Sequence, residues 1–229
     1  QMGNSEVGHM NLGAGRIVYQ DLAKLNLAVE HKTMSQEKPL MDAFDYAKNN
    51  NKAIHFLGLV SDGGVHSHTS HLRGLIDAAQ ESGVQKMFVH AFTDGRDVDP
   101  KSGANYILDL ENYLQNTNAK LASVIGRYYA MDRDKRWERV KLAYELLVNA
   151  KGTHSKNAVT SINESYAIDT TDEFIQPIVM VDENDNPIAK VQDEDVVIFF
   201  NFRTDRGREL TEVLSQKDFH EFNMHKLDL

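Results

Sequence analysis

The chain contains no cysteine and no long apolar run. Across 229 residues the cysteine count is zero, so disulfides and thiolate zinc sites are excluded and a reducing compartment, the cytoplasm, is favoured. No stretch approaches the roughly 20 apolar residues that a membrane-spanning helix requires, and nothing resembles a signal peptide. We therefore expect a soluble cytoplasmic chain with no membrane partner.

An excess of positive charge is also missing. Lys and Arg number 25 against 34 Asp and Glu, which gives a net charge of −9, and this balance argues against a nucleic-acid partner. The glycine fingerprints Gly-x-Gly-x-x-Gly and Gly-x-x-x-x-Gly-Lys do not follow any predicted strand, which argues against nucleotide use. An anionic ligand would have to be held locally, by arginines that cluster after apolar runs.

Apolar runs of strand length alternate with helical patterns along most of the chain. Strands are predicted at 54–60, 87–92, 120–125 and 196–201, and helices at 39–48, 72–81, 104–114, 137–149, 158–166 and 209–214. The segments 178–181 and 188–191 are predicted to pair as a hairpin at an edge or as a flap. The pattern predicts an α/β fold: a mostly parallel sheet with helices on both faces plus a small β-hairpin.

In an open sheet of this kind ligands bind beyond the carboxyl ends of the strands, where the chain places its polar clusters. The first cluster holds Asp62, His66, His68 and His71. Its histidines can bind a metal, can be solvated or cap the next helix, or one of them can meet a phosphate or move a proton. Spacing alone leaves these alternatives open.

Arginines mark three further clusters. Arg96 and Asp97 can grip a polyol, or belong to a self-contained turn before a helix. In the segment 127–137, Lys135 and Arg136 can pair with neighbouring acids on the surface, whereas Arg127 follows a strand directly and is expected to point across the sheet end.

Arg203 and Arg206 lie three residues apart at a strand-to-helix junction. The two side chains can point the same way, and cations are disfavoured at the N-terminus of a helix, so an anionic ligand would explain them. A lone Ser5 near the beginning of the chain is, on its own, most simply a helix cap, although the same position can present a nucleophile to phosphate.

The sequence closely resembles the cofactor-independent, manganese-dependent phosphoglycerate mutases of the alkaline phosphatase superfamily. The resemblance spans nearly the whole chain and is carried, in family order, by QMGNSEVGH at 1–9, LVSDGGVHSH at 59–68, TDGRD at 93–97, GRYYAMDR at 126–133 and NFRTDR at 201–206. It implies interconversion of 3-phosphoglycerate and 2-phosphoglycerate in glycolysis and gluconeogenesis, through a phosphoserine intermediate, by an enzyme that is monomeric at full length.

The resemblance also implies a role for each matching residue. Ser5 would be the nucleophile and a metal ligand, Asp97 the base for the glycerate hydroxyl, and His66 a neighbour of the transferred group. The substrate would be held by arginines: Arg96 beside the base, Arg127 and Arg133 at the carboxylate and hydroxyls, and Arg203 and Arg206 at the phosphate.

In that family two Mn²⁺ ions activate the serine, and apart from Ser5 their ligands are expected outside this chain. Residues 1–19 would be a remnant of the phosphatase domain, and 20–229 the phosphotransferase domain, slightly truncated at its C-terminus. The isolated chain is therefore expected to be inactive as a mutase. Two alternatives remain: a binding module for small phosphorylated acids, and a metal-dependent hydrolase that uses His66, His68 and His71.

Overall fold

A computed structural model describes Gly13 and residues 20–229. Its centre is a six-stranded sheet in the order β4-β5-β3-β2-β1-β6. The strands are β1 (Ile54–Leu59), β2 (Met87–Thr93), β3 (Ala119–Gly126), β4 (Thr153–Ser155), β5 (Ile178–Met180) and β6 (Val196–Phe199). Strand β1 pairs in parallel with β2 and β6, and β2 pairs in parallel with β3. The predicted α/β fold with a mostly parallel sheet is confirmed.

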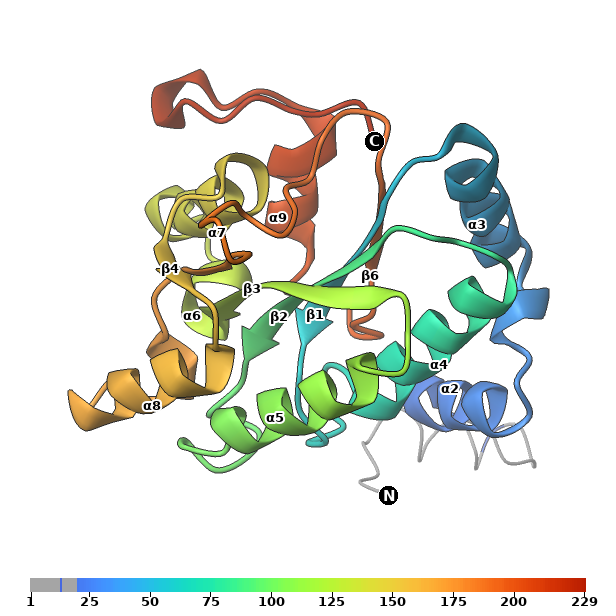
Figure 1. The fold of residues 1–229 in the computed structure, drawn as a ribbon, viewed down its shortest axis with the longest axis horizontal. Coiled ribbons are helices and arrows are strands. Elements are labelled where there is room, and N and C mark those ends of the chain that lie inside the picture. Colours follow the sequence, from blue (N-terminus) through green and yellow to red (C-terminus); the bar gives the residue numbers. More distant parts are fainter. Residues whose placement is uncertain (1–12, 14–19) are drawn as a thin grey trace.

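Helices cover both faces of this sheet, as predicted (Figure 1). One face carries α2 (Asp21–Glu30), α3 (Lys38–Asn50), α4 (Thr69–Glu81), α5 (Gly103–Leu114) and α8 (Ala158–Ala167). The other carries α6 (Arg127–Ala130), α7 (Trp137–Asn149) and α9 (Arg208–Thr211), which continues as a π-helical turn over Glu212–Gln216. None of the helices in the described part of the chain is long and apolar enough to cross a membrane.

Alternation along the strands supplies a hydrophobic core to each face. In β1, Phe56 faces the cluster that includes Leu72 of α4, whereas Leu57 faces the cluster that includes Val140 of α7. Successive side chains of a strand point to opposite faces, so a strand buried on both sides reads as a continuous apolar run. This explains why β1, β2 and β3 are evident from the sequence.

The prediction for residues 178–191 needs correction. Strand β5 lies inside the sheet, antiparallel to β3 and parallel to β4, and is neither an edge strand nor a flap. Beyond the turn at 182–186, only a single antiparallel bridge forms, between Val181 and Pro187. The backbone N–H of Ile188 donates to the carbonyl of Met180, and that of Asp182 to the carbonyl of Asn186, both at 2.8 Å.

A chain of buried polar groups crosses the middle of the sheet. His90 Nδ1 lies 2.7 Å from Ser123 Oγ, His90 Nε2 lies 2.9 Å from His55 Nδ1, and His55 Nε2 lies 3.2 Å from Asp195 Oδ2. Burial, followed by the neighbouring His55, lowers the pKa of His90 well below its ordinary value. Strands β3, β2 and β1 and the residue before β6 are thus joined by side-chain contacts as well as by backbone pairing.

Candidate active site

The carboxyl ends of the parallel strands meet where the strand order reverses. From β1 the chain proceeds to β2 and β3 on one side, and β6 later returns to the opposite side of β1. The side chain of Asn201, just after β6, accepts a hydrogen bond of 3.0 Å from the backbone N–H of Leu59. Such a switch point leaves a crevice at the sheet end and is the usual ligand position in open α/β folds.

The turn after β2 is organised by Asp94. Its Oδ1 accepts hydrogen bonds from the backbone N–H groups of Arg96, at 3.1 Å, and Asp97, at 3.0 Å, while its Oδ2 accepts from Ser61 Oγ at 2.7 Å. Gly95 supports the turn with a φ of +70°, a conformation that glycine adopts most easily. The turn is therefore present but is not self-contained, because Ser61 contacts it from the end of β1, and it places Asp97 at the sheet end.

Arg127 is the central cation of the site. Only 3% of its side chain is exposed, and its Nη1 lies 2.6 Å from Asp94 Oδ1 and 2.7 Å from Asp97 Oδ2. Burial alone would raise the pKa of Asp94, but hydrogen bonds from Asp97 and Ser61 and the charge of Arg127 outweigh it and hold that pKa below its usual value. The same Nη1 of Arg127 thus holds Asp94 and Asp97 side by side at the sheet end.

His66 lies between two carboxylates from different strand ends. Its Nε2 is 3.9 Å from Asp97 Oδ2 and its Nδ1 is 3.8 Å from Asp205 Oδ1. Burial, and next the charge of Arg127, lowers the pKa of His66 to about 4. The imidazole is therefore neutral at pH 7, and its buried Nδ1 has no hydrogen-bond partner among the described residues.

Asp205 binds the arginines that follow two different strands. Its Oδ2 lies 3.0 Å from Arg133 Nη1, and its Oδ1 lies 3.2 Å from Arg203 Nε. Burial opposes ionisation of this carboxyl, but Arg133, Arg203 and His66 together lower its pKa below the ordinary value. Sequence reasoning did not single out Asp205, although it lies inside the NFRTDR motif.

Six arginines line one cavity of about 280 Å³ at this edge, together with the carboxylates of Asp132, Asp134 and Glu173. The six are Arg96, Arg127, Arg133, Arg136, Arg139 and Arg206. Burial, followed by the positive charges of Arg133, Arg127 and Arg96, lowers the pKa of Arg206, and Arg206 Nη1 donates to the carbonyl of Met131 at 3.0 Å. These cations repel one another, and binding of a multiply charged anion would reduce that repulsion.

The arrangement departs from expectation at Arg203 and Arg206. Arg206 lines the cavity just described, whereas Arg203 lines a separate one beside Phe199 and Gly207. Residues 203–207 form turns, and α9 is only four residues long. The two arginines, three residues apart, thus line different cavities, and no long helix begins between them.

The histidines after β1 do not form a metal site. His68 Nδ1 accepts a hydrogen bond from Ser70 N at 3.2 Å and caps α4, as one of the alternatives predicted. His71 is buried, with its Nε2 2.8 Å from Asn26 Oδ1. Within residues 20–229 no metal-binding group includes any of these histidines, so the hydrolase that uses His66, His68 and His71 is contradicted.

Surface pairing explains the charged loop after Arg133. Arg136 Nη1 lies 2.5 Å from Asp134 Oδ2 and 3.4 Å from Asp132 Oδ1.

Arg96, which is half exposed, lies 3.4 Å from Glu173 Oε1. Glu173 was also missed by sequence reasoning, because it reaches the site from a 3₁₀ turn, η2 (Asp172–Phe174), with no local motif.

Ser5 lies outside the described residues. Among the described residues, the strand-end site contains no cluster of His and carboxylate ligands able to hold Mn²⁺. The groups gathered there are cations and the carboxylates that neutralise them, which suit an anion.

Known proteins resemble this chain along its whole length. It is 76% identical over 229 residues to the 2,3-bisphosphoglycerate-independent phosphoglycerate mutase of Flavobacterium psychrophilum and 60% identical over 227 residues to that of Parabacteroides distasonis. These matches cover 100% and 99% of this chain but only 45% of each relative. The chain thus spans less than half the length of these relatives.

A solved structure of a phosphoglycerate mutase also resembles this chain. A crystal structure of Leishmania mexicana phosphoglycerate mutase at low cobalt concentration matches with a TM-score of 0.88 and 32% identity, over 99% of this chain and 43% of that one. The family model described as "BPG-independent PGAM N-terminus" matches residues 25–229. The chain therefore belongs to the BPG-independent phosphoglycerate mutase N-terminal family.

Proposed function

We propose that this chain is the substrate-holding part of a phosphoglycerate mutase that interconverts 3-phosphoglycerate and 2-phosphoglycerate. The observation that carries the proposal is the cavity where Arg96, Arg127, Arg133 and Arg206 converge. A phosphoglycerate offers a phosphate and a carboxylate, and paired N–H donors of arginine match both. Phosphoryl transfer depends chiefly on alignment and charge neutralisation, which this site supplies.

Asp97 is the group that moves a proton in this proposal. Its carboxylate is fixed by Arg127 at 2.7 Å and can accept the proton of a glycerate hydroxyl placed in the cavity. His66, neutral at pH 7 because burial lowers its pKa to about 4, can donate a hydrogen bond to a phosphate oxygen. The arginines orient the glycerate while Asp97 selects the hydroxyl.

The remaining parts of the proposal rest on the family. Ser5 is proposed as the phosphoryl acceptor and as one metal ligand, residues 1–19 as part of the phosphatase domain, and 20–229 as the phosphotransferase domain. Two Mn²⁺ ions, held mainly by residues outside this chain, would activate the serine and neutralise the phosphate. The full-length protein is proposed to be a cytoplasmic monomer acting in glycolysis and gluconeogenesis.

Calorimetry with 3-phosphoglycerate tests the binding half of the proposal. The chain is expected to bind it in a salt-sensitive way, and Arg206→Met is expected to weaken binding by about tenfold, as loss of a charged hydrogen bond of roughly 1.5 kcal/mol implies. The matched control is Arg73→Met, because Arg73 lies on α4 and pairs with Asp109 away from the cavity. Equal weakening in both variants would contradict the site.

An activity assay tests the catalytic half. With Mn²⁺ present, the chain alone is expected to produce no 2-phosphoglycerate, whereas a protein of the relatives' full length is expected to do so. If the chain binds substrate but the full-length protein has no mutase activity, the binding-module alternative replaces the mutase. Turnover by the chain alone would show that the required metal ligands are not missing.

A further inference from the structure

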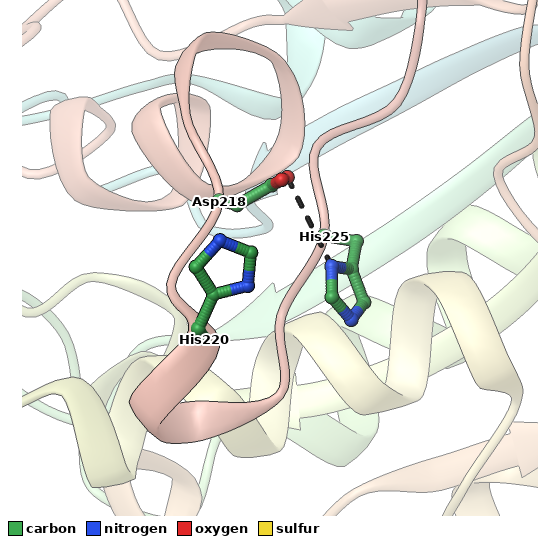
Figure 2. A group of neighbouring side chains, drawn as sticks. All are labelled: Asp218, His220 and His225. Carbon is green, nitrogen blue, oxygen red and sulfur yellow. Dashed lines mark ion pairs between the residues drawn. The ribbon is translucent and has the colours of Figure 1, made fainter.

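A short hairpin at residues 217–226 gathers three metal-ligating side chains away from the arginine cavity. Phe219 and Met224 form an antiparallel bridge around η4 (His220–Phe222), and Asn223 closes the turn with a φ of +54°. This folding brings Asp218, His220 and His225 together on one side of the hairpin (Figure 2). Residues seven positions apart in sequence thereby become neighbours.

The hairpin is firmly anchored to α7. Met224 is fully buried, and the ring of Phe219 lies 4.4 Å from that of Trp137. Tyr144 Oη donates to the carbonyl of His225 at 2.7 Å and accepts from its backbone N–H at 3.0 Å. The backbone that carries the three side chains is therefore held in place although the side chains themselves are exposed.

We propose that Asp218, His220 and His225 bind a divalent transition metal ion, with Zn²⁺ the best match. Two imidazoles and one carboxylate form a ligand set typical of Zn²⁺, with a solvent molecule as fourth ligand. The ligand atoms all lie within 4.8 Å of one another, and His225 Nδ1 is 4.0 Å from Asp218 Oδ1. Tetrahedral Zn²⁺ spaces its ligand atoms about 3.4 Å apart, so small side-chain rotations complete the site.

Two local features favour closure onto an ion. Asp218 Oδ1 accepts a hydrogen bond from Lys226 N at 2.9 Å, which orients the carboxylate toward the histidines. The rings of His220 and His225 lie 5.8 Å apart, and neither forms a hydrogen bond to another described residue that binding would have to break. The bound ion would cross-link the two arms of the hairpin, which packs against α7.

The lone tryptophan of the chain provides the readout. Because Trp137 contacts Phe219, Co²⁺ bound at the hairpin is expected to quench its fluorescence in a saturable, one-to-one manner, and Zn²⁺ is expected to reverse the quenching by competition. Loss even of a group that supports a metal ligand costs about 10- to 100-fold in affinity. His220→Ala and His225→Ala should each weaken Co²⁺ binding by at least that much.

Two further variants complete the test. Asp218→Asn keeps an acceptor for Lys226 N but loses the charge, and should weaken binding without unfolding the hairpin. His154→Ala is the matched control, because His154 is an exposed histidine paired with a single carboxylate, Asp185, at 3.1 Å. Zn²⁺ should raise the thermal midpoint of the wild type and of His154→Ala but not of His220→Ala. Absence of saturable quenching, or equal quenching in His220→Ala, would overturn the site.

Discussion

Arg133 Nη1 lies 3.0 Å from Asp205 Oδ2, so the arginine after β3 is neutralised by a carboxylate that follows β6. Asp205 also contacts Arg203 and faces His66. In the absence of substrate it supplies the negative charge that these cations require. Under the proposed function, a phosphoglycerate would compete with Asp205 for the same donors.

Asp205→Asn is therefore expected to tighten binding of 3-phosphoglycerate. Partly exposed ion pairs contribute about 0.2–1 kcal/mol, which corresponds to roughly a one-and-a-half- to fivefold gain in affinity. Calorimetry at low ionic strength measures it. Asp109→Asn is the control, because it removes the same charge from a pair with Arg73 on the α4–α5 surface. Weaker binding in Asp205→Asn alone would mean that Asp205 positions the arginines and does not compete with the substrate.

Gly95→Ala is expected to destabilise the chain and disturb the site. An added Cβ would lie 2.8 Å from the backbone nitrogen of Glu173, at a φ of +70°. Left-handed backbone costs a residue with a Cβ about 1–2 kcal/mol, and the backbone clash adds to this. We expect a loss of about 2–4 kcal/mol in urea unfolding.

Gly83→Ala separates the two contributions. Gly83 also has a positive φ, of +90°, but its Cβ would meet only the flexible side chain of Lys48, at 3.5 Å. The loss there should be about 1–2 kcal/mol, from backbone strain alone. Equal losses in the two variants would show that the segment around Glu173 moves aside freely.

Stability is expected to fall as the pH falls from about 6.5 toward 4. Burial, followed by the neighbouring His68, lowers the pKa of His71 to about 4, so in this window the unfolded chain binds a proton that the folded chain does not. The free energy of unfolding should then decrease with falling pH by up to about 1.4 kcal/mol per pH unit for each such histidine. Urea titrations from pH 7.5 to 4.5 measure the slope.

The matched variants isolate this contribution. His71→Gln should have a shallower slope than the wild type, because its unfolded state no longer gains that proton. His154→Gln, at an exposed histidine, should retain the slope of the wild type. A slope unchanged by His71→Gln would show that His71 is protonated in the folded chain.

Ser123→Ala is expected to cost about 1–3 kcal/mol, because it leaves His90 Nδ1 buried without its partner at 2.7 Å. Ser165→Ala is the control: its hydroxyl donates within α8 to the carbonyl of Ser161, and its removal should change stability by less than about 0.5 kcal/mol. Thermal unfolding followed by circular dichroism compares them. Similar losses in the two variants would contradict a stabilising role for the buried polar side chains that run from Ser123 to Asp195.

Local signals explain which parts of the fold the sequence predicts. Strands β1, β2 and β3 are apolar runs because both of their faces are buried, and α7 shows helical periodicity over its full length. Strands β4 and β5 are three residues each. Runs this short carry almost no period, so their pairing depends on neighbours that sequence inspection does not reveal.

In the site, too, the residues with a local sequence signal are predictable and those that depend on distant contacts are not. Arg127 is predictable because it follows β3 directly, and Asp97 because it lies in the turn after β2; the fold brings such positions together. Asp205 as a partner of Arg133, and Glu173 as a partner of Arg96, depend on contacts across 72 and 77 residues. The polar chain from Ser123 to Asp195 was missed for the same reason: single polar residues within apolar runs reveal a network only when the strand register is known.

The position of β6 beside β1 has a consequence for synthesis on the ribosome. Residues 61 and 203 lie at neighbouring strand ends although most of the chain separates them, so the crevice depends on contacts of high sequence separation. While β1, β2 and β3 emerge and pair, the arginines after β3 have neither Asp205 nor Arg206 beside them. A nascent chain halted before residue 206 lacks Arg206 and should therefore bind phosphoglycerate more weakly than a chain that extends beyond this residue.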